Sequence, residues 1–255
     1  MERDLVALLA GFLVAVVTTP VGVSGAVFLL PVQLSVLGVP NPQLTPTNLV
    51  FNVVSGPGGL LRYARRRQLD RSLALQLIAG SVPGVVLGAL LRVYVVADPQ
   101  VFRLLAVVVL VPSGLLILRP PAPGSLHRSL QPRTVVALAF AVGTVGGIYG
   151  IGGGSVLGPI LVGTGMAVSR AAPAALASTW VTSIVGVATY AVISSYAEGS
   201  IAPDWSLGLA AGIGGLAGGW VGASVQPRIP EAGLRRLLGV LALVLAGWYL
   251  LQSFT

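Results

Sequence analysis

The sequence predicts an all-α integral membrane protein of about ten transmembrane elements, arranged as two inverted repeats of five helices each. Three observations support this prediction. Of the 255 residues, 55% are hydrophobic and 9% are charged, which is too little polar surface to cover a water-soluble globule. Several apolar stretches reach the roughly 17 to 25 residues that a membrane-spanning helix requires. The same order of apolar segments and glycine-rich breaks also occurs twice along the chain.

The apolar segments fall into two matching sets around a polar connector. The first set comprises 5–37 with a break at 20–25, 44–61, 73–96 and 101–118, and the second comprises 135–168 with a break at 146–154, 173–193, 205–225 and 234–251. The sequence therefore predicts a first repeat at 1–118, a connector at 119–133 and a second repeat at 134–255.

The first long segment of each half is predicted to form a helical hairpin. Its arms in the first half, 5–19 and 24–37, contain about 15 residues each, or roughly 22 Å of helix at 1.5 Å per residue. That length is short for a full span, so the hairpin should enter and leave the membrane on the same side. Counting both arms gives five helices per repeat.

The two breaks match position for position, since VGVSGAVFLLP at 21–31 aligns with YGIGGGSVLGP at 149–159. The identical or similar pairs are Gly22/Gly150, Val23/Ile151, Gly25/Gly153, Leu29/Leu157 and Pro31/Pro159. Later in each half, 80–89 aligns with 214–223, and both carry glycine at every fourth position. This spacing is typical of helices that pack closely in membranes.

The arginines predict how the repeats are oriented. The chain has no lysine, and its formal charge of +8 comes from arginines that lie mostly in the connectors. The densest basic connector, 62–71, should be cytoplasmic, and so should the connector at 119–133. The loop equivalent to 62–71 in the second half carries Glu198 and Asp204 without a basic residue and should lie outside, which makes the repeats inverted. The charge therefore reports orientation in the bilayer, and no nucleic-acid partner is expected.

The breaks also predict a binding site. Irregular backbone at membrane depth is tolerated only where protein or a water-filled cavity satisfies it. The second arm of each hairpin begins at a break, and a helix N-terminus carries about half a positive charge. Two such ends meeting near the midplane predict a site for a small anion. The candidate residues at the breaks are Ser24, Gly25, Tyr149, Gly152, Gly153, Gly154 and Ser155.

The helix after each hairpin adds neutral hydrogen-bonding groups. The candidates are Thr47, Asn48 and Asn52 in the first half, and Ser178, Thr179 and Thr182 in the second. Buried hydroxyls and amides coordinate an oxyanion without burying a permanent charge. A purely structural interpretation stays open, because serine and threonine in helices often bond their own i−4 carbonyl.

The sequence argues against an enzyme. All seven carboxylates fall in connectors or termini, and the absence of cysteine excludes thiolate metal sites. We therefore expect no catalytic residue, metal or cofactor. Moving one anionic charge out of a cell with a negative interior releases about 2.3 kcal/mol per 100 mV, which favours export.

The paired glycine-and-proline breaks, each followed by a helix rich in small polar residues, and the later GxxxGxxxGA in each half resemble the TauE/SafE family of sulfite and organosulfonate exporters. This resemblance implies a prokaryotic plasma-membrane permease for sulfite, sulfoacetate or related organosulfonates. The alternatives are a carrier of another small anion such as a carboxylate, or a non-transporting membrane scaffold or intramembrane enzyme. The glycine-faced helices also suggest a homodimer.

Overall fold

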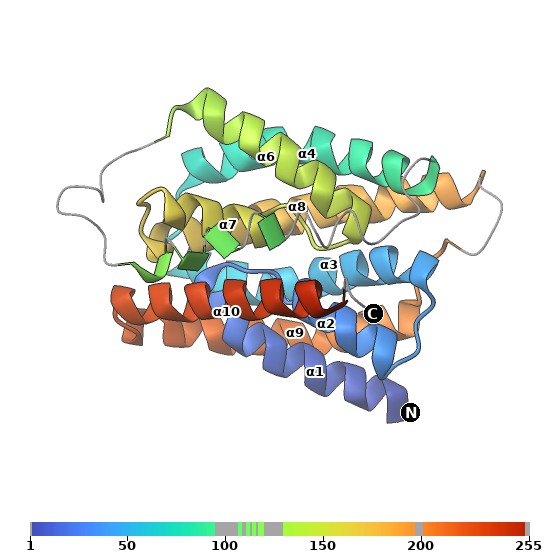
Figure 1. The fold of residues 1–255 in the computed structure, drawn as a ribbon. Helices are drawn as coiled ribbons and strands as arrows, with labels where there is room; N and C mark the ends of the chain where they lie inside the picture. The colour runs from blue at the N-terminus through green and yellow to red at the C-terminus, as the bar shows by residue number, and fades with distance from the viewer. Residues whose placement is uncertain are drawn as a thin grey trace.

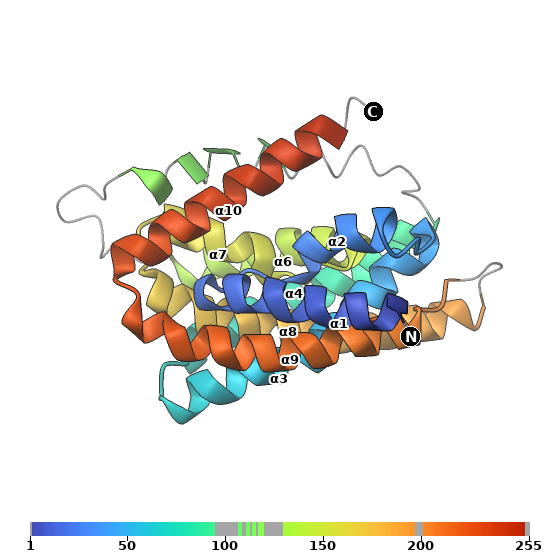
Figure 2. The same cartoon turned by 90° about the horizontal axis from the view of Figure 1, so that it is seen from below.

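The computed structural model describes residues 2–94, 107–108, 111–112, 114–115, 117–119, 130–196 and 201–252, and in this part of the chain it contains helices and no strands. The helices are α1 (Glu2–Thr18), α2 (Ala26–Ser35), α3 (Asn41–Arg65), α4 (Arg71–Tyr94), α6 (Pro132–Tyr149), α7 (Gly154–Gly163), α8 (Val168–Ser194), α9 (Trp205–Val225) and α10 (Glu231–Gln252). Most of them run along a common direction (Figure 1). The outer helix α10 crosses the bundle diagonally (Figure 2).

Six of the described helical segments are long and apolar enough to cross a membrane. They begin at Glu2, Arg71, Pro132, Val168, Trp205 and Glu231. By contrast, α2 and α7 contain 10 residues each, about 15 Å, and are too short to span. The all-α membrane fold predicted from the sequence is therefore confirmed. Most of the predicted helix at 101–118 and of the connector at 119–133 lies outside the described residues.

One face of α1 shows why the bundle suits a bilayer. Leu5, Leu9 and Leu13 recur every fourth residue and are 58%, 51% and 62% exposed. The opposite face, which includes Ala7 and Ala15, is buried against the rest of the bundle. A stripe of exposed leucines along a whole helix is unfavourable in water and favourable against lipid tails.

Glycines bring two helix pairs into backbone contact. A Cβ atom on Gly214 of α9 would lie 1.9 Å from the Leu8 carbonyl oxygen of α1, and one on Gly84 of α4 would lie 2.4 Å from that of Phe140 on α6. No side chain fits at such distances, so the packing role of the two GxxxGxxxGA faces is confirmed. These faces are used inside the chain, so they offer no free surface for the expected homodimer, which stays a prediction.

The polar contacts group the helix ends into two sets. At one end of the bundle, Arg170 at the start of α8 pairs with Asp70, just before α4, at 2.8 Å. Asp70 also accepts the backbone N–H of Leu73, and this bond, together with the Arg170 guanidinium, holds the pKa of the Asp70 carboxyl below its usual value. Glu231 at the start of α10 accepts the backbone N–H of Val168 at the same end.

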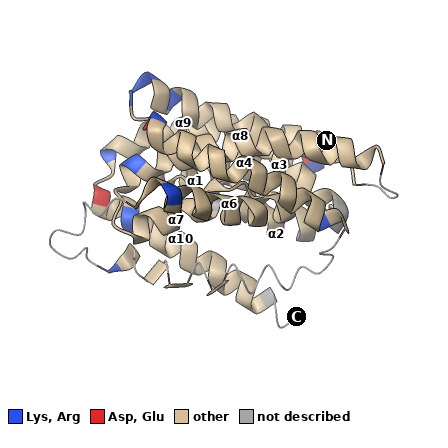
Figure 3. Ribbon diagram, turned by 90° about the horizontal axis from the view of Figure 1, so that it is seen from above, with Lys and Arg blue, Asp and Glu red and all other residues tan. Residues whose placement is uncertain are grey.

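The ends of α3 and α9 lie at the same end of the bundle as the Arg170–Asp70 pair, because Asp70 follows α3 closely in the chain. There Arg66, after the last residue of α3, donates to the Ser224 carbonyl at the end of α9. At the opposite end, the Asp204 N–H before α9 donates to Thr47 Oγ1 in the first turns of α3. As a result α3 and α8 run in opposite directions, as do α4 and α9. Most basic segments lie at the end where α3 and α9 terminate, which we call the arginine-rich end (Figure 3).

The two hairpin breaks share their backbone geometry at two pairs of aligned glycines. Gly22 and Gly150 both adopt left-handed conformations, with φ of 72° and 69°. Gly25 and Gly153 are the N-cap residues of α2 and α7, with φ of −60° and −62°. The breaks differ one residue earlier, where Gly152 has a positive φ of 66° and the aligned serine does not. The alignment inferred from the sequence therefore holds in the backbone at the two glycine pairs.

Two buried tyrosines fasten the breaks from the following long helices. Tyr63 of α3 donates its hydroxyl to the Thr19 carbonyl at 2.9 Å, and Tyr190 of α8 donates to the Gly147 carbonyl at 2.8 Å. Both side chains are at most 1% exposed. Each hydrogen bond satisfies a carbonyl close to the point where the first arm ends.

Candidate functional site

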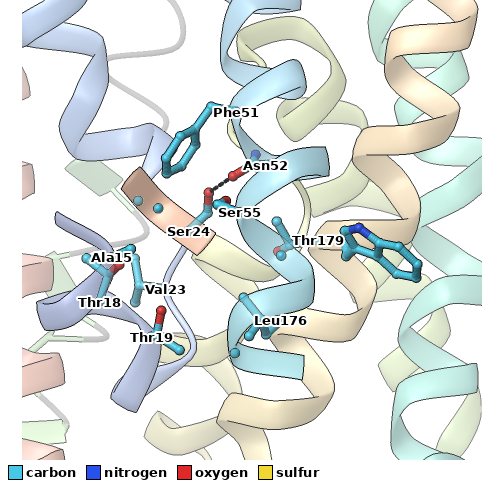
Figure 4. Close-up of a pocket in the computed structure, with 15 residues that line it drawn as sticks. Ala15, Thr18, Thr19, Val23, Ser24, Phe51, Asn52, Ser55, Leu176 and Thr179 are labelled. Carbon is cyan, nitrogen blue, oxygen red and sulfur yellow. Dashed lines mark hydrogen bonds between the residues drawn. The ribbon is translucent and has the colours of Figure 1, made fainter. Parts of the chain in front are cut away.

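A small cavity lies where the first hairpin break meets α3 and α8. Its volume is about 20 Å³, and none of its fifteen lining residues is charged. Its polar lining residues are Thr18, Thr19, Ser24, Asn52, Ser55 and Thr179. Ser24 and Asn52 face each other there, with Thr179 approaching from the neighbouring helix (Figure 4).

Ser24 and Asn52 form the best-defined part of this cavity. The Ser24 hydroxyl donates to Asn52 Oδ1 at 2.6 Å and accepts the Ala26 N–H at 3.2 Å, so Ser24 also caps the first turn of α2. Asn52 is 3% exposed, and its Nδ2 has no hydrogen-bond partner among the described residues. The amide is therefore oriented by Ser24 while both protons of its nitrogen stay available to a ligand.

Thr179 holds the equivalent place beside the second hairpin. Its Oγ1 accepts the Gly154 N–H at 3.0 Å, at the first residue of α7. A Cβ atom on Gly152 would lie 2.5 Å from the Thr179 methyl group, and one on Gly154 would lie 2.3 Å from Oγ1. The glycines at this break thus let the start of α7 approach α8. Because Thr179 and Ser24 cap the helix N-termini, the hydroxyl and amide groups, rather than bare backbone N–H groups, face the cavity.

The other residues predicted in the second half lie beside this cavity and do not line it. Ser178 and Ser81 of α4 are joined by a hydroxyl hydrogen bond of 3.2 Å. A Cβ atom on Gly153 would lie 2.9 Å from Ser81 Oγ, so these residues form a packed polar contact. Thr182 donates to the carbonyls of Ser178 and Thr179 in its own helix, as the structural interpretation of the sequence anticipated.

The remaining predicted residues are spread more widely. Thr47 lies toward the end of the bundle opposite the arginine-rich end. There it donates to the Gln43 carbonyl and accepts the N–H of Asp204. Asn48 is fully buried one turn from Asn52, and its side-chain amide has no partner among the described residues, but it does not line the cavity. Tyr149 ends α6 and is half-buried.

The last two residues predicted at the breaks are Gly25 and Ser155. Gly25 lines the cavity, and a Cβ atom there would lie 3.1 Å from the ring of Phe51. The side chain of Ser155 lies outside the described part of the structure.

The cavity is suited to a small anion by chemistry but not by its present size. Its polar groups are hydroxyls and an amide nitrogen, which can donate hydrogen bonds without burying a fixed charge. A cavity of about 20 Å³ holds roughly one water molecule, less than an oxyanion with several heavy atoms requires. This cavity would have to widen before it could hold such an anion.

Sequence reasoning missed several residues at the site. Thr18 and Thr19 immediately precede the first break, and their polarity next to Pro20 was an available signal. Trp180 closes the cavity between α3 and α8 and donates its indole N–H to the Val53 carbonyl at 3.0 Å. No pattern in the sequence distinguishes that orientation from one facing lipid.

A buried amide on α2 was also missed. Gln33 is 1% exposed, and neither side-chain amide atom has a partner among the described residues. The aligned position in the second half is Leu161, so the glutamine was visible as a polar exception in an apolar arm.

Comparison with known proteins agrees with this architecture. Residues 7–249 match the model of the family described as sulfite exporter TauE/SafE. A probable membrane transporter protein of Xylella fastidiosa strain 9a5c is 26% identical over 258 residues, covering 96% of this chain and 94% of the relative. A protein of the same description from strain Temecula1 is 26% identical over 256 residues, with the same coverage. No solved structure gave a significant match. With six apolar helices long enough to span a bilayer among its described residues, this chain is a multi-pass membrane transporter of the cell membrane and belongs to the TauE/SafE family.

Proposed function

We propose that this transporter exports a small sulfur-containing anion, such as sulfite, sulfoacetate or another organosulfonate, by alternating access. The observation that carries the proposal is the uncharged cavity at the first break, where Asn52 Nδ2 has no partner among the described residues. The amide and the Thr179 hydroxyl approach from α3 and α8, so an anion between them would contact both long helices. The description of the matched family supports sulfite as the ligand class.

The helix packing supports a specific moving boundary. The most extensive contacts join α6 to α4, and α1 and α3 to α9, whereas α8 contacts α4 and α3 to nearly the same extent. We place α8 with α4 and α6, and distinguish an α1–α3–α9 group from an α4–α6–α8 group. The cavity lies between α3 and α8, where these groups meet. We expect rocking of one group against the other to open the cavity to either side, so the moving units would differ from the sequence halves 1–118 and 134–255.

The proposal includes two inverted repeats of five elements, with the arginine-rich end in the cytoplasm. The antiparallel directions of α3 and α8, and the matched geometry of Gly22 and Gly150, support inversion. The basic segments at the end where α3 and α9 terminate support the orientation. On this proposal the chain has a transport role, with a small anion as substrate and no catalytic residue.

Binding of candidate anions to the detergent-purified chain tests the substrate class. A ligand that binds only the native state raises its thermal stability by mass action. Sulfite or sulfoacetate should stabilise the protein, whereas acetate at the same concentration and ionic strength should not. Taurine, which carries an additional amino group, tests whether net anionic charge is needed. Stabilisation by acetate alone would move the assignment to a carboxylate carrier.

Transport itself is tested by efflux of the stabilising anion from proteoliposomes with an imposed membrane potential. Export driven by the potential should accelerate as the compartment holding the anion becomes more negative. The potential supplies a driving force of about 2.3 kcal/mol per charge per 100 mV. An anion that binds but shows no protein-dependent flux would contradict the exporter proposal.

A further inference from the structure

Two arginines of α3 share one tryptophan of α9 at the arginine-rich end. The guanidinium carbons of Arg62 and Arg65 lie 5.2 and 5.1 Å from the centre of the Trp220 ring. Each distance is within the range of a cation–π interaction. The arrangement brings two positive charges to one half-buried indole.

Two more arginines converge within one turn of Trp220. Arg66, after α3, and Arg228, after α9, both donate to the carbonyl oxygen of Ser224, at 3.5 and 3.1 Å. That carbonyl belongs to the last turn of α9, where the helix dipole is negative. Four guanidinium groups from two separate segments thus gather around the end of a single helix. We call Arg62, Arg65, Arg66 and Arg228 the α9 arginine cluster.

The α9 arginine cluster lacks a compensating acid in the part of the chain that the structure describes. The ion pair found there joins Arg170 to Asp70 and involves none of the four. Arg62 Nε is also buried without a hydrogen-bond partner among the described residues. A partial helix charge and one aromatic face offset only part of the repulsion among four cations.

The position of the cluster indicates which anion would neutralise it. Trp220 continues a lipid-suited stripe on α9, in which Ile213 and Leu216 are 57% and 43% exposed. The cluster follows this stripe at the end of the helix, the level at which a bilayer places its headgroups. A cluster of arginines at helix ends next to lipid-exposed apolar surface fits a phospholipid phosphate with its acyl chain along the stripe.

Among the described residues, the corresponding surface of the second half, formed by α8 and α4, has no such cluster. The positions on α8 that align with Arg62 and Arg65 are Thr189 and Val192, and the position on α4 that aligns with Trp220 is Val86. A basic end required only for orientation needs no such convergence on one indole and one carbonyl. The cluster is therefore a feature of one surface, α3 with α9.

We propose that the α9 arginine cluster binds the phosphate headgroup of an anionic phospholipid in the leaflet at the arginine-rich end. Arg62 and Arg65, held against Trp220, present planar guanidinium groups that match phosphate geometry. Arg66 and Arg228 hold the end of α9 beside them. Trp220 and the four arginines do not line the cavity at the hairpin break, so this site is separate from the proposed substrate site.

Native mass spectrometry of the full chain in detergent, titrated with phosphatidylglycerol or phosphatidylcholine, tests this site. The double variant Arg62→Gln/Arg65→Gln should bind phosphatidylglycerol about 30-fold more weakly, at about fivefold per arginine near a headgroup. The matched control Arg67→Gln/Arg71→Gln removes the same charge from the same connector, away from Trp220 and Ser224. The control should keep nearly wild-type affinity. Equal losses in both double variants would overturn the proposal, because they would indicate diffuse electrostatic attraction.

Two further arms separate the site from its alternatives. Arg62→Lys/Arg65→Lys keeps both charges but loses the planar guanidinium groups over Trp220, so its affinity for phosphatidylglycerol should also fall. Full affinity in that variant would contradict a role for the guanidinium groups. Phosphatidylcholine should bind more weakly than phosphatidylglycerol, and inorganic phosphate should not displace the lipid. Displacement by phosphate alone would make this a small-anion site, and thermal unfolding in lipid-free detergent checks that every variant is folded.

Discussion

Asn52→Leu separates binding from folding at the candidate site. The side chains have the same branched shape, although leucine is the larger, and the exchange removes a buried Nδ2 without a partner among the described residues. Removing an unpaired buried donor relieves a cost of about 1–3 kcal/mol, but the buried Ser24 hydroxyl then loses its acceptor, at a cost of about 1–3 kcal/mol. The free energy of unfolding without ligand should therefore change by less than about 2 kcal/mol in either direction.

Anion binding should weaken. A hydrogen bond to a charged ligand contributes about 1.5–3 kcal/mol, so the Kd should rise about 10- to 160-fold. At 100 times the wild-type Kd, the ligand adds about 2.7 kcal/mol to the stability of the wild type, but only about 0.4 kcal/mol to a variant with 100-fold weaker binding. Thermal unfolding with and without sulfite measures this difference. Unchanged stabilisation and unchanged efflux for Asn52→Leu would refute the site assignment.

Gln33→Leu provides a matched control for Asn52→Leu. It also replaces a buried amide without a partner among the described residues, at a position that does not line the cavity. Leucine already occupies the aligned position, Leu161, in the second half. The control breaks no side-chain hydrogen bond among the described residues, so it should not lose stability and should keep sulfite binding and efflux.

Three other predictions concern packing, the breaks and pH. Gly84→Ala should lower the free energy of unfolding by about 1–3 kcal/mol in a denaturation assay, because its Cβ would lie 2.4 Å from a carbonyl of α6. Gly247→Ala, where a Cβ would have no neighbour within 4 Å, should be neutral or stabilising by up to about 1 kcal/mol in the same assay. Tyr63→Phe removes one of two hydrogen bonds to the Thr19 carbonyl, which still accepts the Gly22 N–H, so it should cost about 0.5–1.5 kcal/mol, measured by thermal unfolding. Because the pKa of Asp70 is lowered in the fold, the ionised carboxyl stabilises the fold above its unfolded pKa, and this stabilisation is lost as pH falls through the folded pKa. Asp70 is only partly buried, so Asp70→Asn should lower the free energy of unfolding by less than about 1 kcal/mol at pH 7. The difference from wild type should shrink below about pH 4 in the same assay.

The parts of the fold that the sequence predicted correctly depend on local chemistry. Gly22 and Gly150 both have positive φ, which only a glycine adopts readily, so the breaks could be read from residue type. Glycine at every fourth position likewise predicts a close helix contact whatever the partner is. The partner was not predictable: Gly84 faces α6 and Gly214 faces α1, and both pairings cross between the sequence halves.

The site was predictable at the level of segments and less so at the level of residues. Asn48 and Asn52 share a helix face, but the cavity extends along α3 from Phe51 to Gly59 and reaches only Asn52 of the two. Thr182 bonds carbonyls of its own helix, an outcome that its residue type made as plausible as ligand contact. Gly153 proves to pack against Ser81, so Gly153→Leu would disturb folding and cannot report on binding alone.

The pairing of α1 with α9 sets the order in which this chain can be completed. Leu8 and Gly214 meet some 200 positions apart in the chain, so α1 must wait in the membrane until α9 has been inserted. During that interval lipid must cover the surfaces that α1 and α9 later bury together. A chain ending after α8 would leave α1 without its partner, while α4 and α6 could already pair. Assembly should therefore begin with the pairing of α4 and α6 and finish when α9 packs against α1.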